Sequence, residues 1–193
     1  MSNLKNSPII APMRMGVPHN TTAIQAGSNG KVPEGRARLS IKVMIDAAIQ
    51  APTWKNSQTG RYYVAMSEDK INYLRNQCLP SFNASSCENA VALIITAYET
   101  KRSGFERDGS PTNELGDKWG VYDLGLQNEN LILKARETGY DTLIIGIRDA
   151  DKIRSGFDIP ESQEIVSVIV VGVRENDAEK PKRKTPDDIT RFF

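Results

Sequence analysis

Histidine and cysteine are scarce in this chain of 193 residues, which contains one histidine, His19, and two cysteines, Cys78 and Cys87. A Ser-His-Asp triad or a histidine-rich metal centre has little to build on with one histidine. Two cysteines are too few for a disulfide scaffold or a four-ligand zinc site. We therefore expect no metal site, and an enzyme built on this sequence would need a bound cofactor for its difficult chemistry.

Long apolar runs and an excess of charge are also missing. No apolar stretch approaches the roughly 20 residues that a membrane-spanning helix requires, and residues 1–12 lack the basic start and continuous apolar core of a secretory signal. The 25 basic residues nearly balance the 24 acidic ones, so the formal net charge is +1. A nucleic-acid-binding chain normally carries a clear basic excess. These features predict a cytoplasmic protein with no membrane or nucleic-acid partner.

The familiar phosphate-binding motifs are absent as well. The segment Gly27-Ser-Asn-Gly-Lys31 is too short for a P-loop, and valine rather than serine or threonine follows its lysine. No G-x-G-x-x-G sequence follows a predicted strand, so nothing supports a Rossmann dinucleotide site.

The chain length suits one domain with an arm in front of it. Residues 1–35 are rich in Ser, Asn, Gly, Pro and Thr and show no sustained periodicity, which predicts an irregular N-terminal arm. Residues 36–193 are predicted to form a single domain. Its first helix is expected from Ser40, as the N-cap, to Gln50, because apolar residues recur there at helical spacing and Pro52 prevents its continuation.

Strand and helix patterns then alternate along the chain. Helices are expected at residues 67–77, 117–138 and 149–156, and strands at 61–66, 91–97, 142–147 and 165–173. The second and the fourth of these strands are apolar almost throughout, which is typical of central strands covered on both faces. This interleaving predicts an α/β or α+β fold.

Three further segments are expected to pack against another part of the protein or another subunit, or to bind a ligand. The helix at 117–138 is apolar on several sides, which indicates burial in the domain centre or against another subunit. The charged tail ends in apolar residues, with Ile189 and two phenylalanines, so we expect it to pack onto a surface. The loop at 101–116 is long enough to be a lid or a binding segment.

The most informative segment lies between the first helix and the first strand and reads Ala51-Pro-Thr-Trp-Lys-Asn-Ser-Gln-Thr59. Pro52 and Thr53 form a rigid turn, while the carboxamides of Asn56 and Gln58 each offer a donor and an acceptor. Paired carboxamides can bind a planar heterocycle whose edge alternates C=O and N–H groups. The alternative is an ordinary connection in which these amides cap their own backbone.

The order helix, Ala-Pro-Thr-x-x-Asn-Ser-Gln, strand resembles the A-P-S/T-x-x-N-x-Q signature of the FMN-dependent nitroreductase family. Two further blocks are similar to that family. Residues 123–146 resemble its long interface helix and the flavin-contacting strand after it. The valine-rich strand ending at Arg174 and the basic segment Pro-Lys-Arg-Lys184 resemble its final strand and tail. The resemblance extends from about Ser40 to the C-terminus.

The resemblance implies an architecture and a chemistry. The implied fold is α+β with three layers, α/β/α, in which helices flank a mostly antiparallel central sheet and the long helix lies at a subunit interface. The implied assembly is a homodimer that binds FMN between its subunits, with the C-terminal tail packed on the partner. NAD(P)H would be the co-substrate, and hydride would pass through the flavin to a small flat acceptor such as a nitroaromatic or a quinone.

The resemblance also implies a set of binding residues and no catalytic side chain, because the flavin N5 carries the chemistry. The side chains around the isoalloxazine and ribityl groups would be Pro52, Thr53, Asn56 and Gln58. The backbone amides at the flavin N5 and O4 edge would be those of Leu143, Ile144, Ile145 and Gly146. Arg183 would meet the FMN phosphate, with Lys182 and Lys184 beside it, and the alternative for this segment is a solvated basic tail.

One block of the family has no counterpart in this chain. Family members usually carry an Arg-Arg-Ser-x-Arg-like sequence before the first helix, where it contacts the phosphate. Only the segment around Arg14 partly resembles it. Arg36 and Arg38 lie nearer to the signature and are candidate phosphate ligands by charge alone.

The acceptor side of the site and the direction of the reaction stay open at this point. Phe105 and Arg102, in the loop at 101–116, are the candidate substrate-binding residues. The same scaffold hosts flavin-dependent oxidation of biosynthetic intermediates, and a fold does not decide between such reactions. A flavin-binding or scaffold protein without turnover is a third interpretation, favoured by the missing arginine block.

Overall fold

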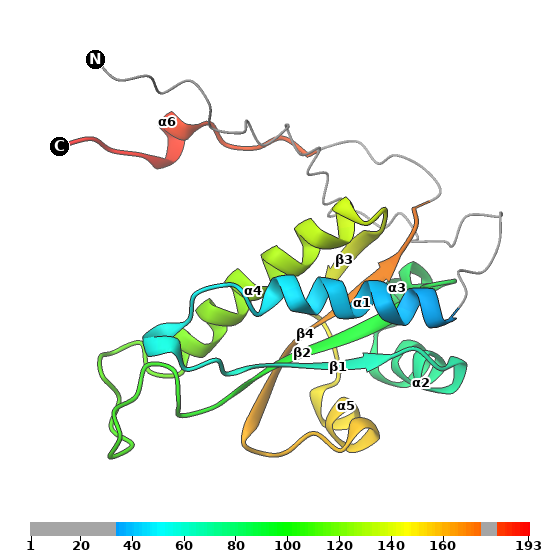
Figure 1. The fold of residues 1–193 in the computed structure, drawn as a ribbon, viewed down its shortest axis with the longest axis horizontal. Coiled ribbons are helices and arrows are strands. Elements are labelled where there is room, and N and C mark those ends of the chain that lie inside the picture. Colours follow the sequence, from blue (N-terminus) through cyan, green and yellow to red (C-terminus); the bar gives the residue numbers. More distant parts are fainter. Residues whose placement is uncertain (1–33, 175–180) are drawn as a thin grey trace.

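The structure, a computed structural model, describes residues 34–174 and 181–193, which are built around a four-stranded sheet (Figure 1). Its strands are β1 (Gly60–Ala65), β2 (Ala92–Glu99), β3 (Asp141–Ile145) and β4 (Gln163–Gly172). They lie in the order β1-β2-β4-β3, and every neighbouring pair is antiparallel. β1 and β3 are therefore the two edges of this sheet.

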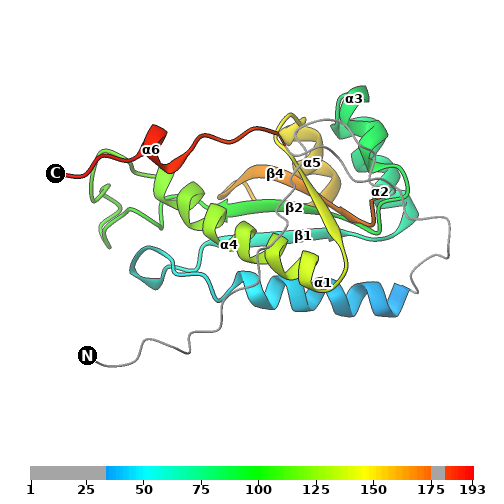
Figure 2. The same ribbon diagram turned by 90° about the horizontal axis from the view of Figure 1, so that it is seen from above.

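Helices cover both faces of the sheet, so the fold has three layers (Figure 2). One face carries α1 (Glu34–Ala48) and α4 (Lys118–Glu137). The other carries α2 (Glu68–Tyr73), the π-helical turn η2 (Leu74–Cys78), α3 (Ser81–Ala84), the 3-10 turn η3 (Ser85–Cys87) and α5 (Ala150–Phe157). The 3-10 turn η1 (Trp54–Asn56) precedes β1, and α6 (Pro186–Ile189) lies in the C-terminal segment. The predicted α+β fold, with helices on both faces of an antiparallel sheet, is confirmed.

β2 and β4 are buried because each is paired on both sides and covered on both faces. In β2, Leu93 and Ile95 face the core beneath η2 and α5, while Ile94 faces the core beneath α1 and α4. None of these three side chains is exposed. The prediction of two central, doubly covered strands is confirmed.

β4 contains a bulge opposite β2. Consecutive residues of β2 pair with Ser167 and Ile165, so Val166 is left out of the register. Side chains normally alternate between the two faces of a strand, yet Ile165 and Val168 both lie in the core on the α5 side. The extra residue is what places both of them on that face.

α1 begins earlier than the sequence analysis predicts. The helix starts at Glu34, so Ser40 lies inside it rather than at its N-cap, and the Ser40 hydroxyl donates to the Arg36 carbonyl (3.1 Å). The buried face already includes Ala37, which is 3% exposed and lies about one turn before Ser40. Burial of this face therefore extends the helix past the polar serine.

Other predicted boundaries are confirmed. The Ser67 side chain caps α2 by accepting from the Lys70 N–H (3.4 Å), and Asp149 caps α5 by accepting from the Lys152 N–H (3.1 Å). Gly139 follows α4 with a φ of 87°, a left-handed conformation that glycine adopts without strain.

α4 is the longest helix in the described part of the chain. Its inner face buries Leu124, Leu131 and Ala135, whereas Val121 and Tyr122 on another side are 42% and 59% exposed. The predicted burial in the domain centre thus accounts for one apolar side of this helix. No helix among the described residues is both long and apolar enough to cross a membrane.

Replacing glycine by alanine should have opposite effects on stability at two positions of α4. A Cβ on Gly120 would lie 2.3 Å from the ring of Tyr98, which is 5% exposed, whereas a Cβ on Gly125 would meet no atom within 4 Å. Gly120→Ala should lower the free energy of unfolding by about 1–3 kcal/mol through overpacking. Gly125→Ala should raise it by up to about 1 kcal/mol, because alanine has the higher helix propensity. Urea denaturation measures both variants, and equal changes would contradict this packing.

Candidate functional site

The loop between α1 and β1 has an unusual backbone. Lys55, Asn56 and Gln58 have positive φ angles of 45°, 56° and 50°. Asparagine tolerates this region, but for lysine and glutamine it costs on the order of 1–3 kcal/mol each, and such strain persists only where the surroundings impose it. The loop is therefore a candidate for function.

Asp123 of α4 holds this loop in place. One oxygen of its carboxylate accepts hydrogen bonds from the Trp54 backbone N–H (2.9 Å) and from the Ser103 hydroxyl (2.6 Å), and the residue is 3% exposed. The carboxylate thereby joins the loop at 52–59 to α4 and to the loop at 101–116. The sequence analysis missed this role, and the signal that could have found it is a carboxylate on the buried face of a helix.

The carboxamides of Asn56 and Gln58 bond to each other, and both side chains are exposed. Gln58 Nε2 donates to Asn56 Oδ1 (3.1 Å), while the Gln58 backbone N–H donates to the Thr53 hydroxyl (3.1 Å). Among the described residues, neither carboxamide bonds to a backbone group. The amide N–H donors of Asn56 and the carbonyl acceptor of Gln58 thus stay available, while Thr53 closes the turn and Pro52 is exposed.

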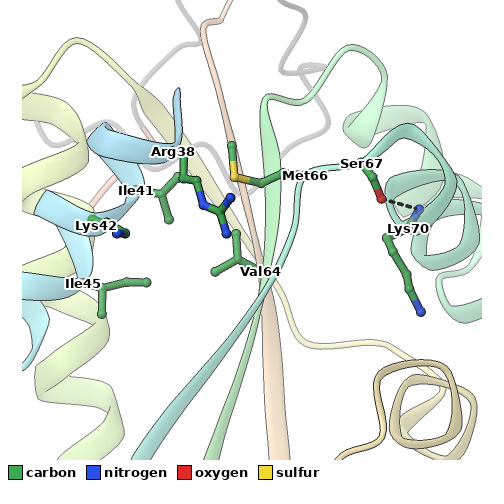
Figure 3. Close-up of a pocket in the computed structure, with 8 residues that line it drawn as sticks. All are labelled: Arg38, Ile41, Lys42, Ile45, Val64, Met66, Ser67 and Lys70. Carbon is green, nitrogen blue, oxygen red and sulfur yellow. Dashed lines mark hydrogen bonds between the residues drawn. The ribbon is translucent and has the colours of Figure 1, made fainter. Parts of the chain in front are cut away.

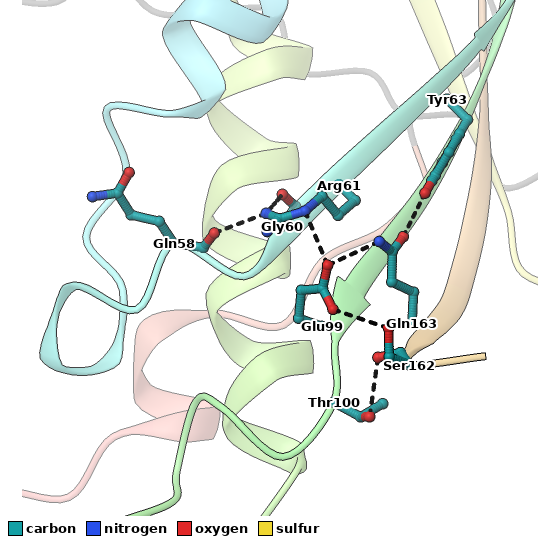
Figure 4. Close-up of polar contacts among 8 residues, drawn as sticks. All are labelled: Gln58, Gly60, Arg61, Tyr63, Glu99, Thr100, Ser162 and Gln163. Carbon is teal, nitrogen blue, oxygen red and sulfur yellow. Dashed lines mark hydrogen bonds and ion pairs between the residues drawn. The ribbon is translucent and has the colours of Figure 1, made fainter. Parts of the chain in front are cut away.

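A chain of polar contacts fixes the end of this loop to the sheet (Figure 4). Arg61 donates from Nη1 to the carbonyls of Gln58 (2.9 Å) and Gly60 (2.8 Å). Its Nε lies 3.3 Å from Glu99 Oε1, which also accepts from Gln163 Nε2 (2.9 Å). The loop, β1, β2 and β4 are thereby joined through one carboxylate.

The loop at 101–116 lies against the carboxamide loop. Lys55 Nζ is 2.9 Å from Glu106 Oε1, and this hydrogen bond holds the pKa of Glu106 below its ordinary value. Phe105 is half-buried and forms an isolated β-bridge with Pro111, whereas Arg102 is exposed. The segment predicted for the acceptor side is therefore next to the segment predicted for flavin binding.

Aromatic rings pack where the carboxamide loop meets α4. The ring centroids of Trp54 and Trp119 are 4.4 Å apart, and Tyr122 lies edge-on to Trp119 at 5.6 Å. Trp119 Nε1 donates to Asn113 Oδ1 (3.0 Å), which extends the contact to the loop at 101–116. This cluster anchors η1 on the start of α4.

The other predicted binding segment lies at the far edge of the sheet. Leu143, Ile144 and Ile145 belong to β3, and Gly146 follows where the pairing with β4 ends. Gly146 and Ile147 are exposed, and within the described part of the chain their N–H groups donate no hydrogen bond. Two adjacent free donors can bind a ligand edge that carries hydrogen-bond acceptors.

The two predicted groups do not meet within one chain. β1 and β3 are opposite edges of the sheet, separated by three strand spacings of about 4.8 Å each. The register places Ile145, the last residue of β3, level with Tyr63 of β1 through Val168 and Ile95, so Gly146 also lies further along the sheet than Gly60, where the carboxamide loop ends. Asn56 and Gln58 therefore do not face Gly146 in a single copy.

The candidate phosphate ligands are exposed where the structure describes them. Arg183 donates to the Pro181 carbonyl two residues before it (3.0 Å), and its two flanking lysines are exposed. Arg36 and Arg38 lie exposed near the start of α1, while Arg14 lies outside the described residues. Among the described ion pairs none involves Arg183, Arg36 or Arg38, so these guanidinium groups can bind an anion.

A hollow that the sequence analysis did not predict lies between α1 and β1 (Figure 3). It has a volume of about 340 Å³ and is lined by Arg38, Ile41, Lys42, Ile45, Val64, Met66, Ser67 and Lys70. The Lys70 ammonium is turned to the Gly156 carbonyl (2.6 Å), so Arg38 and Lys42 supply the charge above an apolar floor. Its lining comes from separate segments, which no local motif connects.

Removing the Asp123 carboxylate should release the strained loop. Asp123→Ala leaves the Trp54 N–H and the Ser103 hydroxyl without their acceptor, and each such bond to a charged group contributes about 1.5–3 kcal/mol. For the two bonds together we expect the free energy of unfolding to fall by about 3–6 kcal/mol in urea denaturation. Asp123→Asn keeps an acceptor oxygen in the same place and should lose less than half as much. An alanine variant as stable as the wild type would show that the carboxylate does not hold the loop.

The chain is similar to known proteins of one family. The sequence model described as the Nitroreductase family matches residues 37–173, and no curated protein matches the chain. Among solved structures of the same fold is a protein from Exiguobacterium sibiricum, described as a nitroreductase in complex with FMN. It is 21% identical, with a TM-score of 0.73 over 90% of this chain and 93% of that one.

Two further structures share the fold. A protein from Staphylococcus epidermidis, described as an NAD(P)H:FMN oxidoreductase, is 20% identical, with a TM-score of 0.74 over 89% of this chain and 91% of that one. CLA-ER, an enone reductase of gut-bacterial fatty acid saturation, is 18% identical, with a TM-score of 0.72 over 89% of this chain and 92% of that one.

Proposed function

Because the chain belongs to the nitroreductase family, we propose that it is an FMN-dependent oxidoreductase that takes hydride from NAD(P)H and delivers it to a flat acceptor such as a nitroaromatic or a quinone. FMN and NAD(P)H are supported by the similar structures whose descriptions name them. The observation in this chain that carries the proposal is the strained loop. It presents the free donors of Asn56 and the free acceptor of Gln58 where the family signature has its carboxamides.

The residues of this chain fit FMN in three places. The pyrimidine edge of the flavin alternates carbonyl and N–H groups, which Asn56 and Gln58 can match. The free N–H groups of Gly146 and Ile147 suit the acceptors at the N5 and O4 edge. Arg183 suits the phosphate, because its guanidinium is exposed and offers paired donors.

Bound FMN would supply the hydride transfer itself. The chain would supply binding and electrostatics, because donors aimed at the ring edges favour the negative charge that reduction places there. Asp123 and Arg61 keep the carboxamide loop in its strained conformation, so its donors need no reorganisation. Phe105 and Arg102 would lie on the acceptor side. The scarcity of histidine agrees with a reaction in which no side chain is the catalyst.

We further propose a homodimer in which each FMN site uses both copies. The carboxamide loop and Gly146 lie apart in one chain, so one ring can contact both groups only if the second comes from a partner. Apolar surface for an interface is present: Val121 and Tyr122 of α4 are 42% and 59% exposed, and Phe192 and Phe193 are 93% and 113% exposed. The C-terminal tail would pack on the partner subunit.

The proposed location is the cytoplasm, whose reducing environment suits two free cysteines. A second candidate function is flavin binding without turnover, which the missing Arg-Arg-Ser-x-Arg block favours. Oxidation of a biosynthetic intermediate on the same scaffold would differ from the proposed function because NAD(P)H would not reduce the flavin, and from the second candidate because its own substrate would.

The visible spectrum of the protein tests the proposed function. Protein purified with added FMN should be yellow, and NADPH or NADH should bleach it in the absence of oxygen. Yellow protein that neither nucleotide bleaches would support the second candidate or the oxidation reaction. Protein that retains no flavin after gel filtration would refute every flavin-dependent proposal for this chain.

Mixed dimers test whether each site is shared between two copies. Asn56→Leu removes the carboxamide, and Gly146→Pro removes one free N–H, so each variant alone should lose FMN while remaining a dimer in light scattering. A mixture allowed to exchange subunits contains dimers with one intact site, and should regain up to about half of the FMN per heterodimer. The exposed Gln77→Leu variant is the control for a lost carboxamide elsewhere. A 21 kDa species in light scattering, or no recovery on mixing, contradicts the shared site.

A further inference from the structure

Arg148 clamps the peptide group that carries the second of the two free N–H groups. Its Nη1 donates to the Gly146 carbonyl (3.1 Å), and its Nη2 donates to the Ile165 carbonyl of β4. The same guanidinium thus bridges the end of β3 and the neighbouring strand at the point where β3 leaves the sheet. It fixes the position of the Gly146–Ile147 peptide relative to β4.

The charge of Arg148 is not neutralised by a carboxylate in the described part of the chain. Its side chain is half-buried, its Nε is buried without a partner, and none of the described ion pairs includes it. Arg154, which also donates to carbonyls before and within β4, is paired with Glu161 at 3.6 Å. A half-buried cation without a counter-ion is unfavourable, and it favours negative charge placed near it.

The bond to Gly146 also acts through the peptide group. The Gly146 carbonyl and the Ile147 N–H belong to the same peptide, so a cationic donor on the carbonyl polarises it and strengthens the N–H as a donor. This is one of the two N–H groups that have no partner among the described residues. Position, polarisation and charge therefore act in the same direction on a ligand at this edge.

We propose that Arg148 is a positioning residue that orients and polarises the free N–H groups at the end of β3 and thereby makes the site bind reduced FMN more tightly than oxidised FMN. This inference rests on the proposed function, in which those groups meet the flavin N5 and O4 edge. The fixed guanidinium would stabilise the negative charge of the reduced ring through the backbone peptide between them.

The test compares the midpoint potential of bound FMN in the wild type, Arg148→Gln and Arg148→Lys. Arg148→Gln removes the charge, and we expect the preference for reduced over oxidised FMN to fall about tenfold, which is about 30 mV lower for a two-electron couple. Arg148→Lys keeps the charge but cannot reach both carbonyls in the same way, so its potential should fall by less. Arg154→Gln is the matched control, because it loses comparable carbonyl contacts at the start of β4 and should keep the wild-type potential.

The outcomes separate this inference from the function on which it rests. A wild type that binds no FMN would refute the proposed function and the inference with it. A wild type that binds FMN, with an Arg148→Gln variant of unchanged potential, would refute the inference alone. If Arg148→Gln does not fold in circular dichroism, Arg148→Met, which also removes the charge, takes its place, and an unchanged potential in that variant has the same meaning. A fall of equal size in Arg154→Gln would show that the effect is a general loss of structure.

Discussion

The carboxylate of Asp123 joins the turn η1 to two segments that lie far from it in the sequence, the loop at 101–116 and α4. It is buried and accepts two hydrogen bonds on one oxygen, so releasing either donor would leave a buried polar group without a partner. The strained φ angles at Lys55 and Gln58 can persist because this contact and the Arg61–Glu99 pair hold the loop from both ends. The geometry of the candidate site therefore depends on α4 being packed on the sheet.

Local patterns were sufficient for much of the fold. Continuous apolar runs identified the central strands, and Ser67 and Asp149 marked helix starts because their side chains cap the backbone directly. The prediction of Ser40 as the N-cap of the first helix was wrong, because its side chain does not cap the start of α1. Ser40 is polar and precedes an apolar run, but the burial of Ala37 one turn earlier decides where the helix begins. A pattern of a few neighbouring residues does not show which side chains become buried when the helix packs on the sheet.

The candidate site was predictable in part. The Asn56 and Gln58 carboxamides stand out in a short motif, and the structure shows them exposed, with a donor and an acceptor still available. Asp123 and Arg148 act on backbone groups of other segments. Asp123 is 69 residues from Trp54, and Arg148, which follows β3, reaches the Ile165 carbonyl of β4. Such contacts exist only after the sheet has formed, and no spacing in the sequence records them.

The bulge at Val166 makes the candidate site sensitive to the length of β4. Gln163 and Ile165 lie before it, and they receive the contacts from the carboxamide-loop network and from Arg148. Because side chains alternate along a strand, deleting one residue here would turn both over to the other face while leaving the rest of β4 in place. The contact of the carboxamide-loop network with Gln163 and the contact of Arg148 with Ile165 would then be lost together. A change in length at Val166 would therefore disturb the site more than a substitution of the half-buried Val166 itself.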